Sequence, residues 1–198
     1  MTRLDARRRP ISLEEYLRFE NAHPERHEYV AGEVYAMSGA TLRPSRIVQN
    51  LAFRLMERTR GGPCEVHTHD LKVRIGDDRI YYPNLLVLCT PLPGDTLVVR
   101  EPCLIVEVTL PSSAGDRGEK LDAYRRLASL RAYLVVDQRR RRVDRHWRDS
   151  AGAWQRDEYL VEGSVPVACL GTSLTLDEIY EGVDLPSVSE PEPAEYDV

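Results

Sequence analysis

A nearly unbroken apolar run at residues 103–110 constrains the fold more than any other stretch of this 198-residue chain. Such a run is typical of a central strand that is buried on both faces of a sheet. A capped, charged helix is predicted at about 116–129, and residues 132–137 form a second apolar run. A strand, a helix and a strand in this order predict a crossover, in which the two strands are parallel and adjacent.

The rest of the chain alternates between helix and strand signals in a similar way. Ser12 and Glu15 form a capping box, and Ala31 and Gly32 are the turn of a predicted hairpin. The other predicted elements are helices at 11–21, 39–60 and 176–180 and strands at 27–30, 34–37, 64–75, 79–89, 97–99, 142–148 and 154–161. We therefore predict an α/β fold with a central mixed β-sheet flanked by helices.

The length of the chain fits one domain with a full core. We expect a flexible basic N-terminus at residues 1–11, a folded domain at 12–181, and an acidic, Pro-rich disordered tail at 182–198. No apolar run approaches the roughly 18 residues of a membrane helix, and residues 1–10 lack the apolar segment of a signal peptide. The sequence therefore predicts a cytoplasmic protein without membrane association.

Cysteine content and net charge add two expectations. The four cysteines are expected to be buried free thiols, because no export signal precedes them. A net charge of −5 argues against a strongly basic nucleic-acid-binding protein as a whole. The local run Arg139, Arg140, Arg141 and Arg142 is compatible with contacts to DNA phosphates, or with a solvated edge that charges protect from aggregation.

Glu107 is the anomaly within the apolar run, because an isolated buried carboxylate is costly and normally has a partner. Asn84 begins one predicted strand and Glu107 lies near the end of the next major one, so the two converge if these strands are neighbours. Lys120 lies one turn into the following helix, with Tyr124 four residues later on the same face. Oxygen ligands of this kind suit Mg²⁺, and a nearby lysine can assist phosphodiester hydrolysis. The alternative is a structural Glu107–Lys120 ion pair, with Asn84 capping a turn.

Other candidate sites are weaker. Cys64, His67 and His69 resemble zinc ligands, but strand alternation directs Cys64 to the face opposite the two histidines. Ser112 and Ser113 precede a helix, where serine more often caps than acts as a nucleophile. The chain has no glycine-rich phosphate-binding motif.

Several motifs together carry a resemblance to a known family. They are YPNLLVLC at 82–89, LIVEV at 104–108 and DRGEKLDAY at 116–124, with further matches at 26–37 and 133–137. In order and spacing the chain resembles the Uma2 family, within the PD-(D/E)XK nuclease-like superfamily, over residues 12–181. The resemblance implies a restriction-endonuclease-like fold and cleavage of DNA that depends on Mg²⁺ or Mn²⁺. We also expect a homodimer and no small-molecule cofactor.

The resemblance also assigns residues. The two acidic metal ligands of the family fall on Asn84 and Glu107, and the backbone carbonyl of Val108 completes the set. Thr109 stands where the superfamily usually has its lysine, and Lys120 takes that role from the following helix. Asp70 and Glu28 match recurrent acidic positions and are expected to line the site, close to Tyr124.

Three positions depart from the family pattern: Asn84 replaces Asp, Pro44 replaces a frequent His, and Leu110 replaces Ser. An amide in place of a carboxylate offers an oxygen but removes one negative charge, so weaker metal binding is expected. Two hypotheses follow. One is a metal-dependent DNA endonuclease impaired by Asn84, and the other is a catalytically inactive nuclease fold used for binding or assembly.

Overall fold

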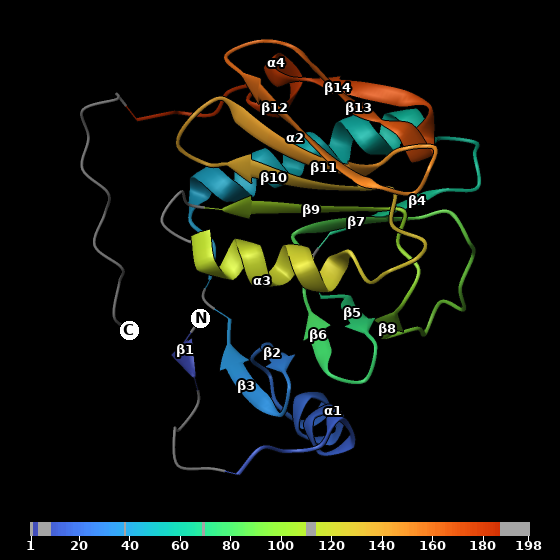
Figure 1. Cartoon of the computed structure of the whole chain (residues 1–198). Helices are drawn as coiled ribbons and strands as arrows, with labels where there is room; N and C mark the ends of the chain where they lie inside the picture. Colours follow the sequence, from blue (N-terminus) through green and yellow to red (C-terminus); the bar gives the residue numbers. More distant parts are fainter. Residues whose placement is uncertain (1, 4–8, 38, 69, 110–113, 187–198) are drawn as a thin grey trace.

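The computed structural model describes residues 2–3, 9–37, 39–68, 70–109 and 114–186 (Figure 1). The helices are α1 (Leu13–Ala22), α2 (Leu42–Thr59), α3 (Ala114–Tyr124) and α4 (Leu176–Ile179), with a short 3-10 helix, η1, at Ala168–Leu170. The strands are β1 (Thr2–Arg3), β2 (His27–Val30), β3 (Glu33–Ala36), β4 (Glu65–Thr68), β5 (Lys72–Ile75), β6 (Arg79–Tyr81), β7 (Leu85–Leu88), β8 (Val98–Val99), β9 (Leu104–Thr109), β10 (Ala132–Asp137), β11 (Arg142–Arg148), β12 (Trp154–Leu160), β13 (Ser164–Val167) and β14 (Thr172–Thr175).

The described strands form two six-stranded sheets and one two-stranded sheet. The larger sheet has the order β12-β11-β10-β9-β7-β4, and the smaller one, below it in Figure 1, has the order β1-β3-β2-β6-β5-β8. Strands β9 and β10 run parallel, as the crossover rule predicts, while the other neighbours in the larger sheet are antiparallel. The predicted mixed sheet flanked by helices is confirmed.

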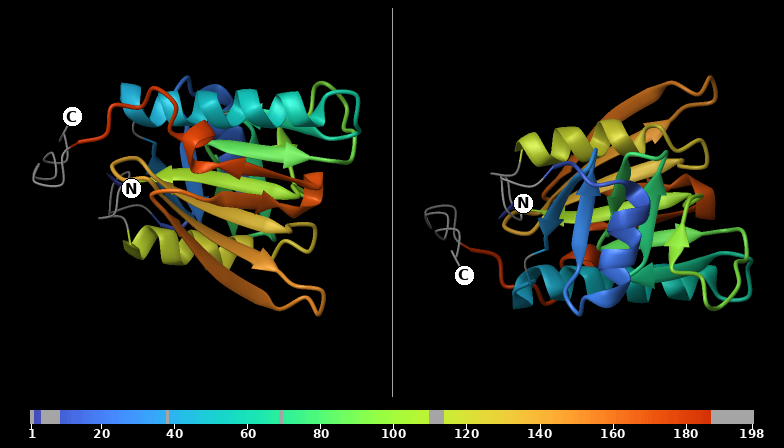
Figure 2. Two further views of the ribbon diagram at one scale, coloured as in Figure 1. Left: turned by 90° about the horizontal axis from the view of Figure 1, so that it is seen from above. Right: turned by 90° about the horizontal axis from the view of Figure 1, so that it is seen from below.

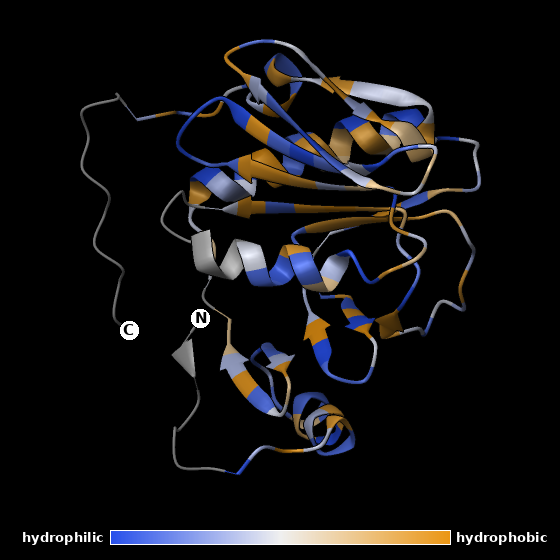
Figure 3. Cartoon of the chain, viewed as in Figure 1, coloured by the Kyte–Doolittle hydropathy of each residue, from blue (hydrophilic) through white to orange (hydrophobic). Residues whose placement is uncertain are grey.

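The larger sheet is covered on both faces, which explains the apolar character of its central strands. Helix α2 lies on one face and α3 on the other, as the two views of Figure 2 show. Leu104 and Val106 of β9 pack in the core beneath α2, whereas Ile105 packs with Tyr124 of α3. Figure 3 shows the apolar colouring concentrated along these central strands. Burial on both faces removes the alternation that a half-exposed strand would have.

The capping box and the hairpin turn form as predicted at the N-terminal end. The Ser12 hydroxyl accepts the Glu15 N–H, and the Glu15 carboxylate accepts the Ser12 N–H. Ala31 and Gly32 have φ values of 49° and 95°, which lie in the left-handed region that favours glycine. A Cβ on Gly32 would also come within 2.6 Å of the Pro10 Cβ, so this turn needs glycine for two reasons.

The strand predicted at 79–89 is wrong, because it is divided between the two sheets. Strand β6 belongs to the smaller sheet and β7 to the larger one, with Tyr82, Pro83 and Asn84 between them. Proline has no N–H to donate to a ladder, so pairing stops there. The region predicted as strand at 64–75 divides in the same way, into β4 and β5. The break places Tyr82 and Asn84 where the two sheets meet.

The cysteine prediction is also wrong, because the structure contains the disulfides Cys64–Cys89 and Cys103–Cys169. Glu65 pairs with Leu88 in the antiparallel β4–β7 register, so Cys64 and Cys89 stand opposite each other, with Cα atoms 3.9 Å apart. Strand spacing alone did not reveal that the two residues come from neighbouring strands. In the described part of the chain, no helix has the length and apolar character needed to cross a membrane.

Candidate functional site

Lys120 of α3 lies between two buried carboxylates that come from different sheets. Its Nζ donates to Glu28 Oε1 at 2.8 Å and to Glu107 Oε1 at 3.4 Å. Glu28, on β2, is 3% exposed, and Glu107, on β9, is 5% exposed. Buried carboxylates are normally paired, and here one ammonium group serves both. The cluster therefore joins the smaller sheet, the larger sheet and α3.

Two tyrosines complete the surroundings of this pair. The Tyr124 hydroxyl, one helical turn beyond Lys120, donates to Glu107 Oε1 at 3.1 Å. The Tyr81 ring lies beneath the ammonium group, with Lys120 Nζ 5.2 Å from the ring centroid. The face of an aromatic ring attracts a cation. Both rings are fully buried, so they fix the positions of the charged groups.

Asn84 lies directly beside Glu107. Leu85 pairs with Val106 across the antiparallel β7–β9 ladder, so the register places Asn84 opposite Glu107 on the same face. Its Oδ1 accepts the Val108 N–H at 2.7 Å. A strand residue directs its N–H and C=O to the same side, so the Val108 carbonyl also faces β7. Pro83, opposite Val108 in this register, has no N–H with which to pair.

Burial and neighbouring charges shift the pKa values of two groups in the cluster. Burial raises the pKa of Glu28; the charge of Lys120 opposes this, and the charge of Glu107 adds to it. Burial also raises the pKa of the Tyr124 hydroxyl well above its ordinary value, and the Glu107 carboxylate raises it further. Tyr124 therefore stays protonated at neutral pH and donates to Glu107.

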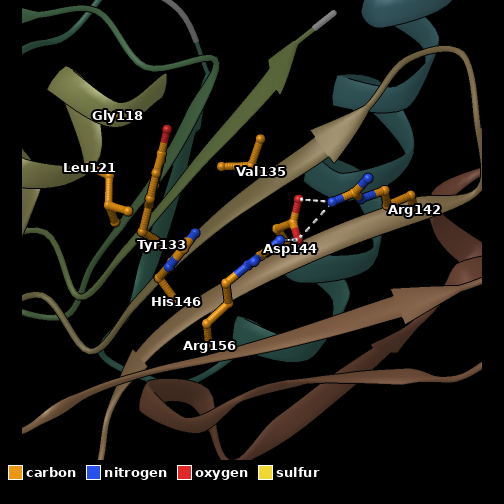
Figure 4. Close-up of a pocket in the computed structure, with 8 residues that line it drawn as sticks. All are labelled: Gly118, Leu121, Tyr133, Val135, Arg142, Asp144, His146 and Arg156. Carbon is orange, nitrogen blue, oxygen red and sulfur yellow. Dashed lines mark hydrogen bonds and ion pairs between the residues drawn. The ribbon is translucent and has the colours of Figure 1, made fainter. Parts of the chain in front are cut away.

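A pocket of about 260 Å³ lies next to the cluster, between α3 and the β11–β12 hairpin (Figure 4). Val135 of β10 stands opposite Glu107 on one side and opposite Asp144 on the other, so the pocket begins one strand from Glu107. The Asp144 carboxylate forms ion pairs with Arg142 at 3.1 Å and with Arg156 at 2.7 Å. The lining residues are Gly118, Leu121, Tyr133, Val135, Arg142, Asp144, His146 and Arg156.

The donor groups fit a hard divalent cation in part. Glu28 and Glu107 receive their hydrogen bonds at Oε1, so their Oε2 atoms have no hydrogen bond among the described residues. These oxygens, with the Asn84 amide and the Val108 carbonyl, are of the type that Mg²⁺ prefers. Within the described ranges, however, no three His, Cys, Asp or Glu side chains gather as a metal site. A cation here would need oxygens from the amide or the backbone.

Asp70 does not join the cluster. Its side chain is exposed, and it pairs with Arg26 at 3.2 Å. The zinc alternative loses its first ligand, because Cys64 is bonded to Cys89. His69 lies outside the described residues. Leu110, Ser112 and Ser113 lie outside them too. Pro44 occupies the first turn of α2, where its missing N–H costs nothing.

The arginine run predicted to contact DNA is not a uniform basic surface. Arg141 forms an ion pair with Asp177, and Arg142 pairs with Asp144 and with Glu158 at 2.6 Å. Arg139 is half-buried, while Arg140 is exposed. Two of the four guanidinium groups therefore already bind acidic side chains.

Tyr82 is a site residue that reasoning from the sequence missed. Its backbone N–H donates to Glu28 Oε1 at 3.4 Å, and its hydroxyl donates to the buried Glu20 at 2.6 Å. Glu20 also contacts His27, the neighbour of Glu28, at 3.0 Å. The signal available in the sequence was the pair Tyr81 and Tyr82 before Pro83, because two successive extended residues direct their rings to opposite faces.

The comparisons with known proteins point to one family. The sequence profile of the Uma2 family, described as "Putative restriction endonuclease", matches residues 13–177. Two curated proteins of Synechocystis sp. (strain ATCC 27184 / PCC 6803 / Kazusa) are similar. "Uncharacterized protein slr1290" is 34% identical over 87% of this chain and 93% of its own length, and "Uncharacterized protein sll1609" is 28% identical over 78% and 90%.

A solved structure shares the fold. It is described as "a putative nuclease belonging to DUF820" from Anabaena variabilis ATCC 29413, with a TM-score of 0.70 and 16% identity, and the match covers 86% of this chain and 98% of that one. The sequence match spans both carboxylates, Asn84 and Lys120, and the fold is of the nuclease type. The chain belongs to the Uma2 family of restriction-endonuclease-like proteins.

Proposed function

We propose that this protein is a DNA endonuclease of the Uma2 family that hydrolyses phosphodiester bonds with Mg²⁺ or Mn²⁺. The observation that supports it most is Lys120 held between Glu28 and Glu107, with Asn84 directly beside Glu107. A nuclease needs acidic oxygens and a cationic group at one point, and this cluster supplies both. Membership of the Uma2 family, described as "Putative restriction endonuclease", supports this reaction class.

Each residue has a proposed role. Glu107, the Asn84 amide and the Val108 carbonyl would hold the cation, which when bound would stabilise the charge that develops on the phosphate. Lys120 would orient the attacking water or attract the phosphate from the opposite side. Tyr124 holds Glu107 in position through its hydrogen bond. Glu28 holds Lys120 in place, and that ion pair offsets the cost of burying the Glu28 carboxylate.

Asn84 sets the expected level of activity. The amide is close in shape to the family's aspartate but carries no charge, and its oxygen already accepts the Val108 N–H. Each lost negative charge near a divalent cation weakens its binding. We therefore propose weak metal binding and slow cleavage in the natural chain.

The deciding experiment is a cleavage assay on duplex and single-stranded DNA with Mg²⁺ or Mn²⁺, at high protein excess. The natural protein should cut slowly, and Asn84→Asp should cut faster because it restores the missing charge. Glu107→Gln within the Asn84→Asp background is the matched control and should abolish the gain. If neither the natural protein nor Asn84→Asp cuts with either metal, the endonuclease proposal fails.

A second function is supported by the contact between Asn84 and Val108. An amide committed to a backbone N–H stabilises the junction of β7 and β9 without any metal. This contact favours a catalytically inactive nuclease fold that acts in binding or assembly. Under that reading, Asn84→Asp gains neither metal binding nor cleavage, while the natural protein still binds DNA or another partner.

The partners and the location stay predictions. DNA phosphates are proposed to reach the cluster along the pocket that Arg142 and Arg156 border. A homodimer is also expected, and light scattering on purified protein tests it. The cytoplasmic location also stays a prediction; disulfides are uncommon in that compartment, which makes the redox state in cells informative.

A further inference from the structure

The four cysteines of the chain meet at one place, although they come from four separate segments. Cys64 precedes β4, Cys89 follows β7, Cys103 precedes β9, and Cys169 lies in η1. The two disulfides touch, because Cys89 Sγ lies 3.5 Å from Cys103 Sγ. The sulfur atoms therefore form a continuous series in the order 64, 89, 103, 169.

This cluster is separate from the proposed nuclease site. Cys103 precedes the first residue of β9, while Glu107 lies near the other end of the same strand. Four residues of extended strand span roughly 13 Å. Asn84 and Cys89 are likewise at opposite ends of β7. The cysteines are therefore not part of that site.

The exposure of the four sulfur-bearing residues differs along the series. Cys103 is buried at 8% exposure, whereas Cys64, Cys89 and Cys169 are all partly exposed. A dissolved thiol can therefore reach an outer cysteine, while an inner pair is positioned to react with itself. Disulfides exchange by attack of a thiolate on a neighbouring sulfur.

We propose that this cluster is a thiol–disulfide exchange site that accepts a low-molecular-weight thiol at Cys64 or Cys169 and forms an internal Cys89–Cys103 disulfide. In the first step, an external thiolate attacks Cys64 Sγ. A mixed disulfide forms at Cys64, the Cys64–Cys89 bond breaks, and its electron pair leaves on Cys89. In the second step, the Cys89 thiolate attacks Cys103 Sγ, forming Cys89–Cys103 and releasing the Cys169 thiolate.

Both steps conserve electrons, because one sulfur–sulfur bond forms for each one broken. Attack at Cys169 runs the same exchange in the opposite direction and releases Cys64. The exchange has a structural result. It removes the disulfide between β9 and η1, so β13, β14 and α4 are then held against the larger sheet by packing, hydrogen bonds and the Arg141–Asp177 ion pair.

Peptide mapping can follow this exchange without ambiguity. Trypsin cuts after Lys and Arg, so each cysteine falls in a different peptide, at 61–72, 80–100, 101–117 and 157–198. The folded full-length protein is incubated with reduced glutathione near pH 8, where a useful share of thiols is ionised. Acid quenching, alkylation of free thiols and mass spectrometry then identify each linked pair.

The expected products are peptide 80–100 linked to 101–117, together with glutathione on Cys64 or Cys169. Cys64→Ser provides the second arm, because it leaves Cys89 as a thiol beside Cys103 from the start. That variant should form Cys89–Cys103 and free Cys169 without added glutathione. Cys89→Ser is the control and should retain Cys103–Cys169 as its only internal disulfide.

Two results would overturn the proposal. One is an intact Cys103–Cys169 pair in both glutathione-treated wild type and Cys64→Ser, with no Cys89–Cys103 peptide detected. The other is a product mixture equal to that of a urea-denatured sample, which would show that exchange occurs only after unfolding. Circular dichroism recorded before quenching verifies that each native sample is folded.

Discussion

Lys120 and Glu28 are 92 residues apart in the sequence, yet the lysine ammonium donates to the glutamate carboxylate at 2.8 Å. The contact joins α3 to the smaller sheet. The same ammonium reaches Glu107 in the larger sheet at 3.4 Å. This one cation therefore balances two buried acids, and several measurable properties depend on it.

The first prediction concerns removal of that cation. Lys120→Met should lower the free energy of unfolding by about 3–5 kcal/mol, because breaking a buried pair leaves unpaired charge, here on two carboxylates. Urea denaturation at neutral pH measures the loss. Glu119→Gln, on an exposed position of the same helix, is the control and should change stability by less than about 0.5 kcal/mol. Equal losses in the two variants would contradict the role of Lys120.

The second prediction concerns pH. The pKa of Glu28 is raised in the folded state, so the folded protein holds this proton more tightly than the unfolded chain does. Its contribution to stability is complete below the unfolded pKa, about 4.3, and is lost as the pH rises through the folded pKa. Glu28→Gln cannot titrate. The free energy of unfolding of the wild type minus that of Glu28→Gln should fall as the pH rises. A free-energy difference that does not change with pH would refute this prediction.

The third prediction compares two buried tyrosines. Tyr124→Phe removes a hydroxyl that donates to Glu107, and should cost about 1.5–3 kcal/mol because the acceptor is charged. Tyr81→Phe is the matched control, since the Tyr81 hydroxyl has no hydrogen-bond partner among the described residues. That change should be neutral or stabilising. Thermal unfolding of both variants tests the difference, and a larger loss for Tyr81→Phe would contradict the hydrogen-bond assignment.

The fourth prediction uses metal binding rather than cleavage. Asn84→Asp places a third carboxylate near Glu107 and Glu28, so it should lower the melting temperature in a chelating buffer. Mn²⁺ should then raise the melting temperature. At a Mn²⁺ concentration about 100 times the dissociation constant, the free energy of unfolding should rise by about 2.7 kcal/mol. Glu107→Gln in the same background should remove the metal response. An unchanged melting temperature on addition of Mn²⁺ to Asn84→Asp would exclude metal binding here.

The fifth prediction concerns the arginine run. Arg140 is exposed, whereas Arg141 pairs with Asp177. If the run contacts DNA, Arg140→Ala should weaken binding equally for all sequences and reduce the slope of log K against log salt by about 1. Fluorescence anisotropy over a salt series measures this slope. Arg18→Ala, on an exposed face of α1, is the control and should leave it unchanged.

The sequence by itself predicted the order of most elements and the pair β9–β10. The capping box of Ser12 and Glu15 and the strand–helix–strand crossover depend on local chemistry and on a general rule of handedness, so neither needs the rest of the fold. The motifs around Asn84, Glu107 and Lys120 also identified the family. Local pattern was sufficient for these features because neighbouring residues determine them.

Tertiary structure decided the features that depend on contacts distant in the sequence. Periodicity does not show that Tyr82, Pro83 and Asn84 separate two sheets, because it does not indicate which strands become neighbours. It also does not show that Lys120 binds Glu28 as well as Glu107. The pairing of Cys64 with Cys89 required the β4–β7 register. Burial and register are set by packing between elements, so the sequence named candidate site residues while the fold determined their partners.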